Sequence, residues 1–325
     1  MEDHSTAGKP GSKRMDSFDQ EDNQDDGYDH EPEQLTIILD GNIADLSAKE
    51  DRASLEYPLF SLSKSPDRKI REYSRGGKVL KIIPSVVGAA NQFDKDLLIW
   101  AVTRLVDLRN REPNRRLSRT IRFETYSFLK ATKRSTGGAA YKRLVDSCQR
   151  LRGTVIQTNI QTTEGERTSG FGMIDTYDVV RSTKDGSGAL ELELTVSDWL
   201  YRQIEGFDVL TLDPGYFALK QPIERRLYEL ARKHCGDQPL WKVGIDVLLA
   251  KSGSRQQRKH FMVDLKKIAA HDNLPSYQLL IDESGAEQMA VFVTRDTKKL
   301  HLHLLKNNLA AWYTTLTQGR IKPLR

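Results

Sequence analysis

The sequence has little of what most enzymes and exported proteins require. Its only two cysteines, Cys148 and Cys235, lack the spacing of a zinc site or a disulfide framework and fit a reducing compartment. The chain also lacks a GxxxxGKS/T phosphate loop and the HExxH, CxxC and GxSxG motifs. We therefore expect a protein that is not an enzyme and that needs no cofactor or metal.

Long hydrophobic runs are absent as well. No apolar run reaches the roughly 18 residues that a membrane-spanning helix needs. The N-terminus also lacks the apolar stretch of a signal peptide. We therefore expect a cytoplasmic protein with no membrane partner.

Charge is distributed unevenly along the 325 residues, whose formal net charge is +5. Residues 1–33 contain eleven acidic residues against three basic ones, a net charge of −8, which leaves +13 for residues 34–325. A strongly basic body favours a polyanion as its partner, because each neutralised phosphate releases condensed counterions. A well-solvated basic surface explains the same charge, so charge alone does not decide between the two.

Residues 1–50 carry few large apolar side chains, so burial cannot offset the entropy cost of ordering them. We predict a disordered acidic N-terminal tail over this range. The short apolar run at residues 35–39 within it is either a docking segment or a single strand.

The rest of the chain alternates between strand and helix periodicity in an order that occurs twice. The first half is predicted to contain strands at 55–63 and 78–83, then helices at 95–109, 124–133 and 138–151, and then strands at 153–161, 171–181 and 189–196. The second half is predicted to contain a helix at 222–235, an apolar segment at 240–243, helices at 244–251 and 255–271, and strands at 277–282 and 289–294.

Helices followed by a helix–turn–helix and a β-hairpin follow the order of a winged helix. We therefore predict an α+β fold with two tandem winged-helix domains, at residues 51–205 and 206–296, followed by a C-terminal extension over 297–325. The first domain would supply backbone contacts or dimerisation, and the second would read a DNA sequence.

The predicted helix at 255–271 is the best candidate for a DNA-reading element. Phe261, Leu265 and Ile268 form its buried stripe, which leaves a basic outer face. An α-helix fits the major groove, where Arg and Gln make bidentate contacts to base edges. The candidate readers are Arg255, Gln256, Arg258, Lys259, Lys266 and Lys267. The alternative is an amphipathic surface helix with a solvated charged face.

Two weaker candidates lie in the first half. The helix at 138–151 presents Lys142 and Arg143, although an acid, Asp146, lies on the same outer face. A basic loop that includes Arg115 and Arg116 suits phosphate contact, and a solvated connector is an equal alternative.

One string favours an enzyme. His301 and His303 flank a leucine in an apolar segment, and Tyr313 follows ten residues later. In rolling-circle nickases of the HUH type, two such histidines on a strand bind a divalent metal and a tyrosine attacks the phosphodiester. We interpret the histidines here as surface or packing residues and keep the nickase as the enzyme alternative.

Five segments, taken in order along the chain, resemble the replication initiator protein A family, to which plasmid RepA-type initiators belong. They are EYPLF at 56–60, DKDLLIW at 94–100, GGAAYKRL at 137–144, the stretch 190–199, and QPIERRLYELARK at 221–233. The resemblance spans roughly residues 55–295 and leaves out the acidic tail and the C-terminal extension.

The resemblance implies a bacterial plasmid replication initiator that binds double-stranded origin DNA, often at repeated sites. It also implies host replication proteins as partners, either a helicase or the host initiator, and a homodimer is a further expected partner state. A winged-helix transcriptional repressor is the alternative from the same class, because it differs only in where its sites lie.

Overall fold

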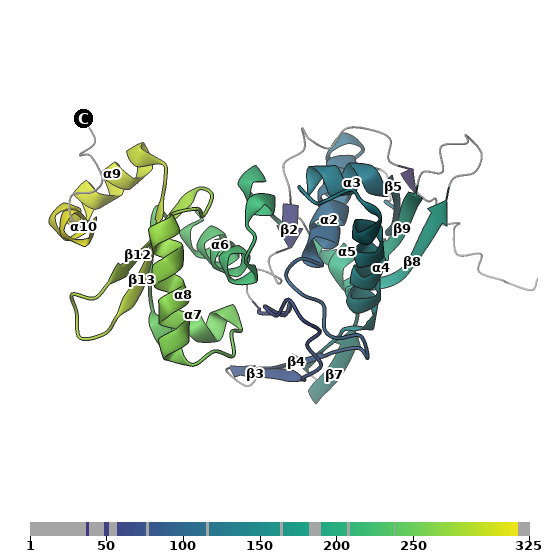
Figure 1. Ribbon diagram of the computed structural model, residues 1–325, viewed down its shortest axis with the longest axis horizontal. Helices are drawn as coiled ribbons and strands as arrows, with labels where there is room; N and C mark the ends of the chain where they lie inside the picture. Colours follow the sequence, from purple (N-terminus) through teal and green to yellow (C-terminus); the bar gives the residue numbers. More distant parts are fainter. Residues whose placement is uncertain are drawn as a thin grey trace, which may run out of the picture. The chain divides into compact units, whose positions relative to one another are not determined.

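Figure 1 shows the computed structural model of the chain. It describes residues 37–38, 49–51, 57–75, 78–114, 117–162, 165–181, 190–206, 209–236 and 238–317. Within these residues no helix has the length and apolar character needed to cross a membrane.

The first half is built on a four-stranded sheet of order β1-β5-β9-β8. β9 lies antiparallel between β5 and β8, and β1 pairs in parallel with β5. Trp100, Phe123 and Phe128 pack in the core between the helices and this sheet, with ring centroids 5.4 to 5.9 Å apart. The elements are β1 (Ile37–Ile38), α2 (Lys95–Arg111), β5 (Thr120–Glu124), α3 (Thr125–Ala131), α4 (Gly138–Gly153), β8 (Ile174–Arg181) and β9 (Leu190–Val196).

The second half repeats this order. Its three-stranded antiparallel sheet, β11-β13-β12, again places the last strand in the centre. Phe261, Leu265 and Ile268 of α8 are buried against the sheet, as their helical spacing predicts. The elements are α6 (Pro222–Cys235), β11 (Leu240–Gly244), α7 (Ile245–Ser252), α8 (Arg258–His271), β12 (Tyr277–Asp282) and β13 (Met289–Thr294).

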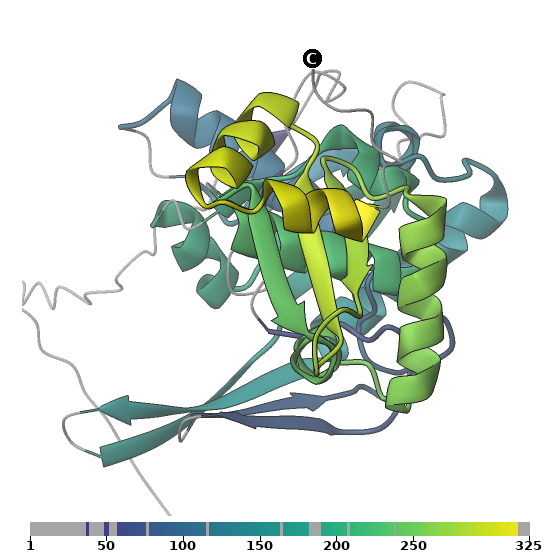
Figure 2. The same cartoon turned by 90° about the vertical axis from the view of Figure 1, so that its left-hand side faces the viewer.

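A second four-stranded sheet, of order β3-β4-β6-β7, interrupts the first half. Its hairpin of β6 (Val155–Thr162) and β7 (Gly165–Phe171) is inserted between α4 and β8. The other hairpin consists of β3 (Arg71–Arg75) and β4 (Lys78–Ile83), and β4 pairs with β6. Figure 2 shows this sheet as long ribbons that extend away from the helices.

Short elements connect the two halves. Helix α5 (Asp198–Glu205) begins after Ser197, whose hydroxyl accepts a hydrogen bond from the Leu200 N–H. Strand β10 (Val209–Thr211) then pairs antiparallel with β2 (Lys49–Asp51), and the short helix η2 (Pro214–Ala218) leads into α6.

The C-terminal helices α9 (Thr297–Lys306) and α10 (Ala310–Thr317) cover the second face of the β11-β13-β12 sheet. Successive residues of a strand point to opposite faces. Phe292 therefore packs with the α6–α8 core, whereas Val291 and Val293 pack with Leu300 and Leu304 of α9. The surface of α9 is thus on the opposite side of the sheet from α8.

A buried charge network joins α2 of the first half to α6 of the second. Glu229, which is fully buried, pairs with Lys95 at 3.0 Å and accepts a hydrogen bond from Gln92. Burial raises the pKa of the Glu229 carboxyl, but the cations Lys95 and Arg226 outweigh this effect and hold that pKa below its ordinary value. The network is satisfied only when both halves are in contact.

A second buried ion pair lies beside it. The Arg225 guanidinium contacts Asp96 at 2.5 Å and lies over the Phe93 ring, 4.5 Å from its centroid. Both charged side chains are almost completely buried. Removing one partner would leave the other charge buried and unpaired, which is strongly unfavourable. These pairs therefore fix how α6 packs against α2.

The expected strand at 55–63 was wrong. In the described part of that range, residues 57–60 form an irregular segment, and Ser61 makes only an isolated bridge to Asn91. The Arg71 guanidinium donates hydrogen bonds to the carbonyl oxygens of Pro58, Leu59 and Phe60 at 2.9 to 3.2 Å. A side chain therefore satisfies the carbonyls that a neighbouring strand would otherwise bind. Leu59 and Phe60 are buried, which explains why their apolar character suggested a strand.

Several further elements were not predicted: strands β3, β5, β7 and β10, the short helix η2, and helices α5, α9 and α10. The expected strand at 171–181 begins only at Ile174. Within the predicted tail, 37–38 and 49–51 form β1 and β2, so the apolar run at 35–39 contributes a strand. The other residues of the predicted tail, 1–36, 39–48, lie outside the described residues, and the proposed domain boundaries stay a prediction.

Candidate nucleic-acid interface

Helix α8 starts three residues later than its periodicity predicts, at Arg258, with Gln257 as its N-cap. The preceding turn contains Gly253 in the left-handed region, at φ 71°. A Cβ at this glycine would lie 2.4 Å from the Pro58 side chain, so only glycine allows the turn to approach the first half this closely. Arg255 and Gln256 therefore lie in the turn before the helix rather than on it.

Several of the predicted readers on and before α8 already have partners. Arg258 pairs with Asp246 at 3.0 Å and donates to the Gln288 amide oxygen at 3.1 Å. Lys266 pairs at 2.9 Å with Glu283, which follows strand β12 in the hairpin. The hydrogen bond from Lys266 holds the pKa of the Glu283 carboxyl below its ordinary value. These surface pairs are weak, and each would have to open before its cation met a phosphate.

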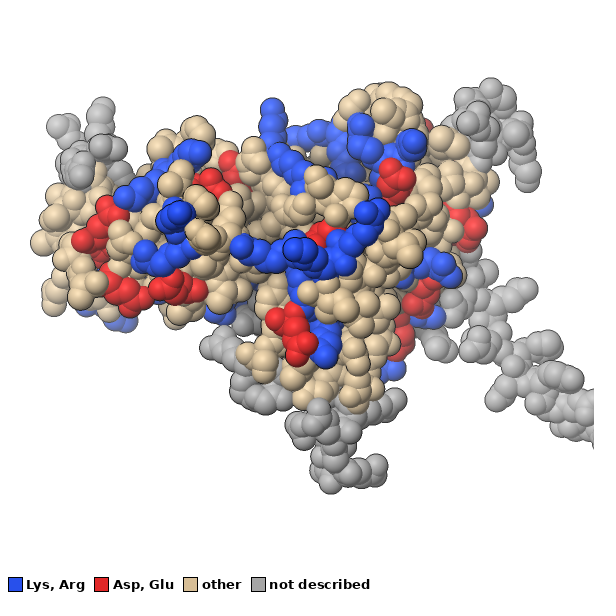
Figure 3. Space-filling view, turned by 60° about the horizontal axis from the view of Figure 1, so that its bottom comes forward, with Lys and Arg blue, Asp and Glu red and all other residues tan. Residues whose placement is uncertain are grey.

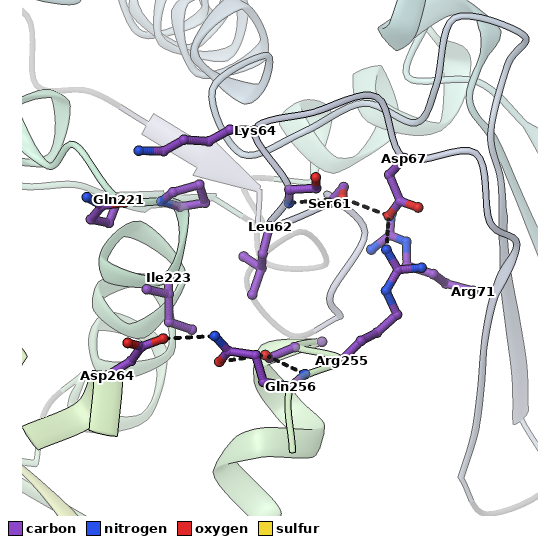
Figure 4. Close-up of a pocket in the computed structure, with 14 residues that line it drawn as sticks. Ser61, Leu62, Lys64, Asp67, Arg71, Gln221, Ile223, Arg255, Gln256 and Asp264 are labelled. Atoms are coloured by element: carbon purple, nitrogen blue, oxygen red, sulfur yellow. Dashed lines mark hydrogen bonds and ion pairs between the residues drawn. The ribbon is translucent and has the colours of Figure 1, made fainter. Parts of the chain in front are cut away.

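Arg255 reaches across to the first half. Its guanidinium contacts the Asp67 carboxylate at 2.9 Å, and Figure 4 shows the two side chains pointing toward each other at the edge of a cavity of about 500 Å³. Asp67 also accepts a hydrogen bond from the Ser61 hydroxyl at 2.8 Å. Burial raises the pKa of Asp67, but these hydrogen bonds and the Arg255 charge bring it below its ordinary value. On the other side of the same cavity Gln256 donates to Asp264 at 2.9 Å.

The remaining two predicted readers of α8 have no such partner. Lys259 and Lys267 are exposed, and neither makes an ion pair or side-chain hydrogen bond with any described residue. They can meet an anion without first breaking a contact.

Helix α4 is the counterpart of α8 in the first half. Lys142 and Arg143 are exposed in its N-terminal part and form no ion pair within the described part of the chain. Arg150 is engaged instead, because its guanidinium makes two hydrogen bonds of 2.7 Å to Asp94. Asp146, the acid that counted against this helix, is half-buried in the wall of a cavity together with Arg143.

A basic segment that sequence reasoning missed lies between the two helices. We call residues 61–70 the 61–70 loop; Lys64, Arg68 and Lys69 are exposed in it. Lys64 lines both the cavity beside Arg255 and the cavity beside Arg143. The Ser65-Pro66-Asp67 turn and the three basic residues are the sequence signals of this loop, whereas the apolar residues just before it predicted a strand at 55–63.

Figure 3 shows Lys and Arg side chains on both halves of one face of the molecule and in the strip between them. Arg115 and Arg116, the predicted phosphate contacts of the basic loop, lie outside the described residues.

The histidine string lies on a helix rather than on a strand. His301 and His303 belong to α9, and Tyr313 is half-buried on α10. Burial raises the pKa of the Tyr313 hydroxyl. No cluster of three or more His, Cys, Asp or Glu side chains suited to a metal ion occurs among the residues that the structure describes.

The two halves share the order helix–strand–helix–helix–strand–strand and carry exposed cations on the third helix, an arrangement typical of DNA-binding proteins. The chain belongs to the family Replication initiator protein A, whose family model matches residues 49–279. It is therefore a replication initiator by family.

A relative agrees with this assignment, and two solved structures share the fold. The chain is 36% identical over 234 residues to a protein of Wigglesworthia glossinidia brevipalpis whose name describes it as a replication protein, a match that covers 72% of this chain and 84% of that protein. Its fold is similar to crystal structures of domains 2 and 3 of RctB, with TM-scores of 0.55 and 0.50 at 14% identity. These two matches cover 73% and 75% of this chain and 95% and 97% of the RctB chains, and at that identity they show a shared fold.

Proposed function

We propose that this chain is a plasmid replication initiator that binds double-stranded origin DNA at repeated sites through two tandem winged-helix domains. Membership of the Replication initiator protein A family is the observation that carries the proposal. The element order of each half supports it, because a winged helix has the same order and places its third helix in the major groove.

The third helices are α4 and α8. In such helices the N-terminal residues contact base edges, and the residues further along meet phosphates. Arg258 is the first residue of α8 and Arg143 lies in the N-terminal half of α4, whereas Lys267 lies more than two turns beyond Arg258 along α8. Arg258 would leave Asp246 to reach a guanine, at a cost of about 1 kcal/mol or less for an exposed pair.

The hairpin between β12 and β13 has a different role from the one that a wing usually has. Its exposed tip carries Glu283 and Glu287, which a phosphate would repel. Glu283 instead engages Lys266. We propose that this hairpin braces α8 rather than gripping the DNA backbone.

The mechanism is mechanical and electrostatic, with no catalytic step by the chain itself. Copies bound on adjacent repeats would bend the duplex, and the deformation would help to open an A·T-rich neighbour. We propose a second copy of the chain and the host replication proteins, a helicase or the host initiator, as partners in the steps that follow.

The test is a plasmid that carries only the origin, with this chain supplied from a second plasmid. Arg143→Ala and Arg258→Ala should each reduce plasmid maintenance and weaken binding to the origin fragment. Lys298→Ala on α9 serves as the control, because Lys298 is exposed on the side of the β11-β13-β12 sheet that faces away from α8. Normal maintenance with both arginines replaced would overturn the proposal.

A further inference from the structure

We propose that the 61–70 loop is a third DNA-contacting element, which lays Lys64 and Lys69 on the phosphates that border the minor groove between the two reading helices. The inference rests on the proposed function: with α4 and α8 in successive major grooves, what lies between them faces the intervening minor groove.

The position of the loop carries the first step of the argument. Lys64 lines the cavity beside the α7–α8 turn and also the cavity beside α4. The Arg255–Asp67 pair ties the loop to the second half at 2.9 Å. The loop therefore borders both reading helices at once.

The loop is held in place by its ends. The Ser61 N–H donates to the Ala90 carbonyl at 2.9 Å, and the Ala89 N–H donates to the Asp67 carbonyl at 2.7 Å. Gly88, at φ 103°, lets the chain pass here, because a Cβ would lie 3.1 Å from both Asp67 and Pro66 backbone atoms. A loop that is already ordered loses little conformational entropy when it binds.

The two lysines of the loop can contact an anion without first breaking an ion pair. Lys64 and Lys69 are exposed, and the side chain of neither makes an ion pair or hydrogen bond with any residue that the structure describes. The one acid of the loop, Asp67, is buried and already engaged by Ser61 and Arg255. The loop thus presents cations without a competing carboxylate.

Apolar side chains beside these cations favour the minor groove over a purely phosphate-bound surface. Ile70 is 62% exposed at the end of the loop. Arg68 donates to the Val86 carbonyl at 2.9 Å and so anchors the neighbouring turn, where Val86 is 88% exposed. Proteins that enter the minor groove combine basic residues with such apolar side chains.

The experiment compares two double variants with the unmodified chain. Lys64→Gln/Lys69→Gln removes the two loop cations, and Lys298→Gln/Lys306→Gln removes two exposed cations of α9 as a matched control. Binding to origin DNA and to scrambled DNA of equal length is titrated with salt, and hydroxyl-radical cleavage reports minor-groove protection.

The loop variant should lower the slope of log K against log salt by about 1.8 units on both DNAs. It should also lose the hydroxyl-radical protection between the two major-groove contacts, while the ratio of specific to non-specific affinity stays unchanged. The α9 variant should match the unmodified chain.

Equal slopes and equal protection for the two double variants would overturn the loop proposal, even if origin preference persists. The absence of any origin preference in the unmodified chain would instead contradict the proposed function. In that case the salt slopes of the two double variants on scrambled DNA still show whether the loop contacts phosphates.

Discussion

Neighbouring lysines on α8 should differ sharply in their contribution to DNA affinity. Lys267 makes no ion pair within the described part of the chain, whereas Lys266 is paired with Glu283 at 2.9 Å. A free cation that meets a phosphate releases about 0.9 counterion, which changes the log–log salt slope by about 0.9. At about 0.15 M salt this corresponds to roughly fivefold in affinity.

Lys267→Gln should therefore lower the slope by about 0.9 units. Lys266→Gln/Glu283→Gln removes a pair that is already neutral, so its slope should stay within about 0.3 units of the unmodified chain. Lys298→Gln has the same charge change as Lys267→Gln but lies on α9, and it should leave the slope unchanged. Fluorescence anisotropy on labelled origin DNA between low and physiological salt measures all three. Equal slopes for Lys267→Gln and Lys298→Gln would refute the assignment of this face of α8 to DNA.

Further predictions concern other parts of the chain. Arg258→Ala should cost about 1–3 kcal/mol on the specific site and relax preference at one base position, measured on a panel of single-base variants; an unchanged panel contradicts the reading role. Glu229→Gln should destabilise the fold by about 3–5 kcal/mol in urea unfolding, because it leaves buried cations unpaired; a change below 1 kcal/mol, on the order of a surface pair, would show that the network is not needed. Burial raises the thiol pKa of Cys148 and Cys235 to about 12, so both should resist iodoacetamide at neutral pH until the chain unfolds; rapid labelling of the folded chain would exclude the buried placement. Deleting residues 1–33, whose net charge is −8, should tighten non-specific DNA binding at low salt and change little at high salt; equal affinities at low salt would remove any competition between the tail and DNA.

The sequence was sufficient for elements whose periodicity is strong. Helix α4 and strands β12 and β13 lie where they were predicted, because apolar residues recur at helical spacing along α4 and form short runs on either side of a turn in the two strands. Helix α6 was also found from its proline at the first helical position and its apolar stripe. The repeated order of elements in the two halves followed from these segments.

Polar strands and long-range contacts could not be predicted in the same way. Strand β7 contains Gly165 and Gly170 and little apolar character, so only its pairing with β6 makes it a strand. The apolar segment before the 61–70 loop looked like a strand, because nothing local reveals that Arg71 binds its carbonyls.

The residues of the candidate site likewise divide into those that local sequence patterns predict and those that only long-range contacts bring together. Charge and helix position predicted the exposed cations of α4 and α8. The pairing of Arg255 with Asp67 joins residues 188 positions apart, and the backbone hydrogen bonds that hold the 61–70 loop join it to Ala89 and Ala90. These contacts are distant along the chain, so no local sequence pattern predicts them.

Footprinting shows whether the chain reads repeated origin sites with two helices, as replication initiation by this route requires. The purified chain is incubated with DNA that flanks its gene, and dimethyl sulfate and hydroxyl-radical protection are mapped on both strands. We expect repeated sites, each with two protected major-groove segments about one helical turn apart and protection of the minor groove between them. No protected repeats, or a metal-dependent nick with the chain covalently attached through Tyr313, would contradict this expectation.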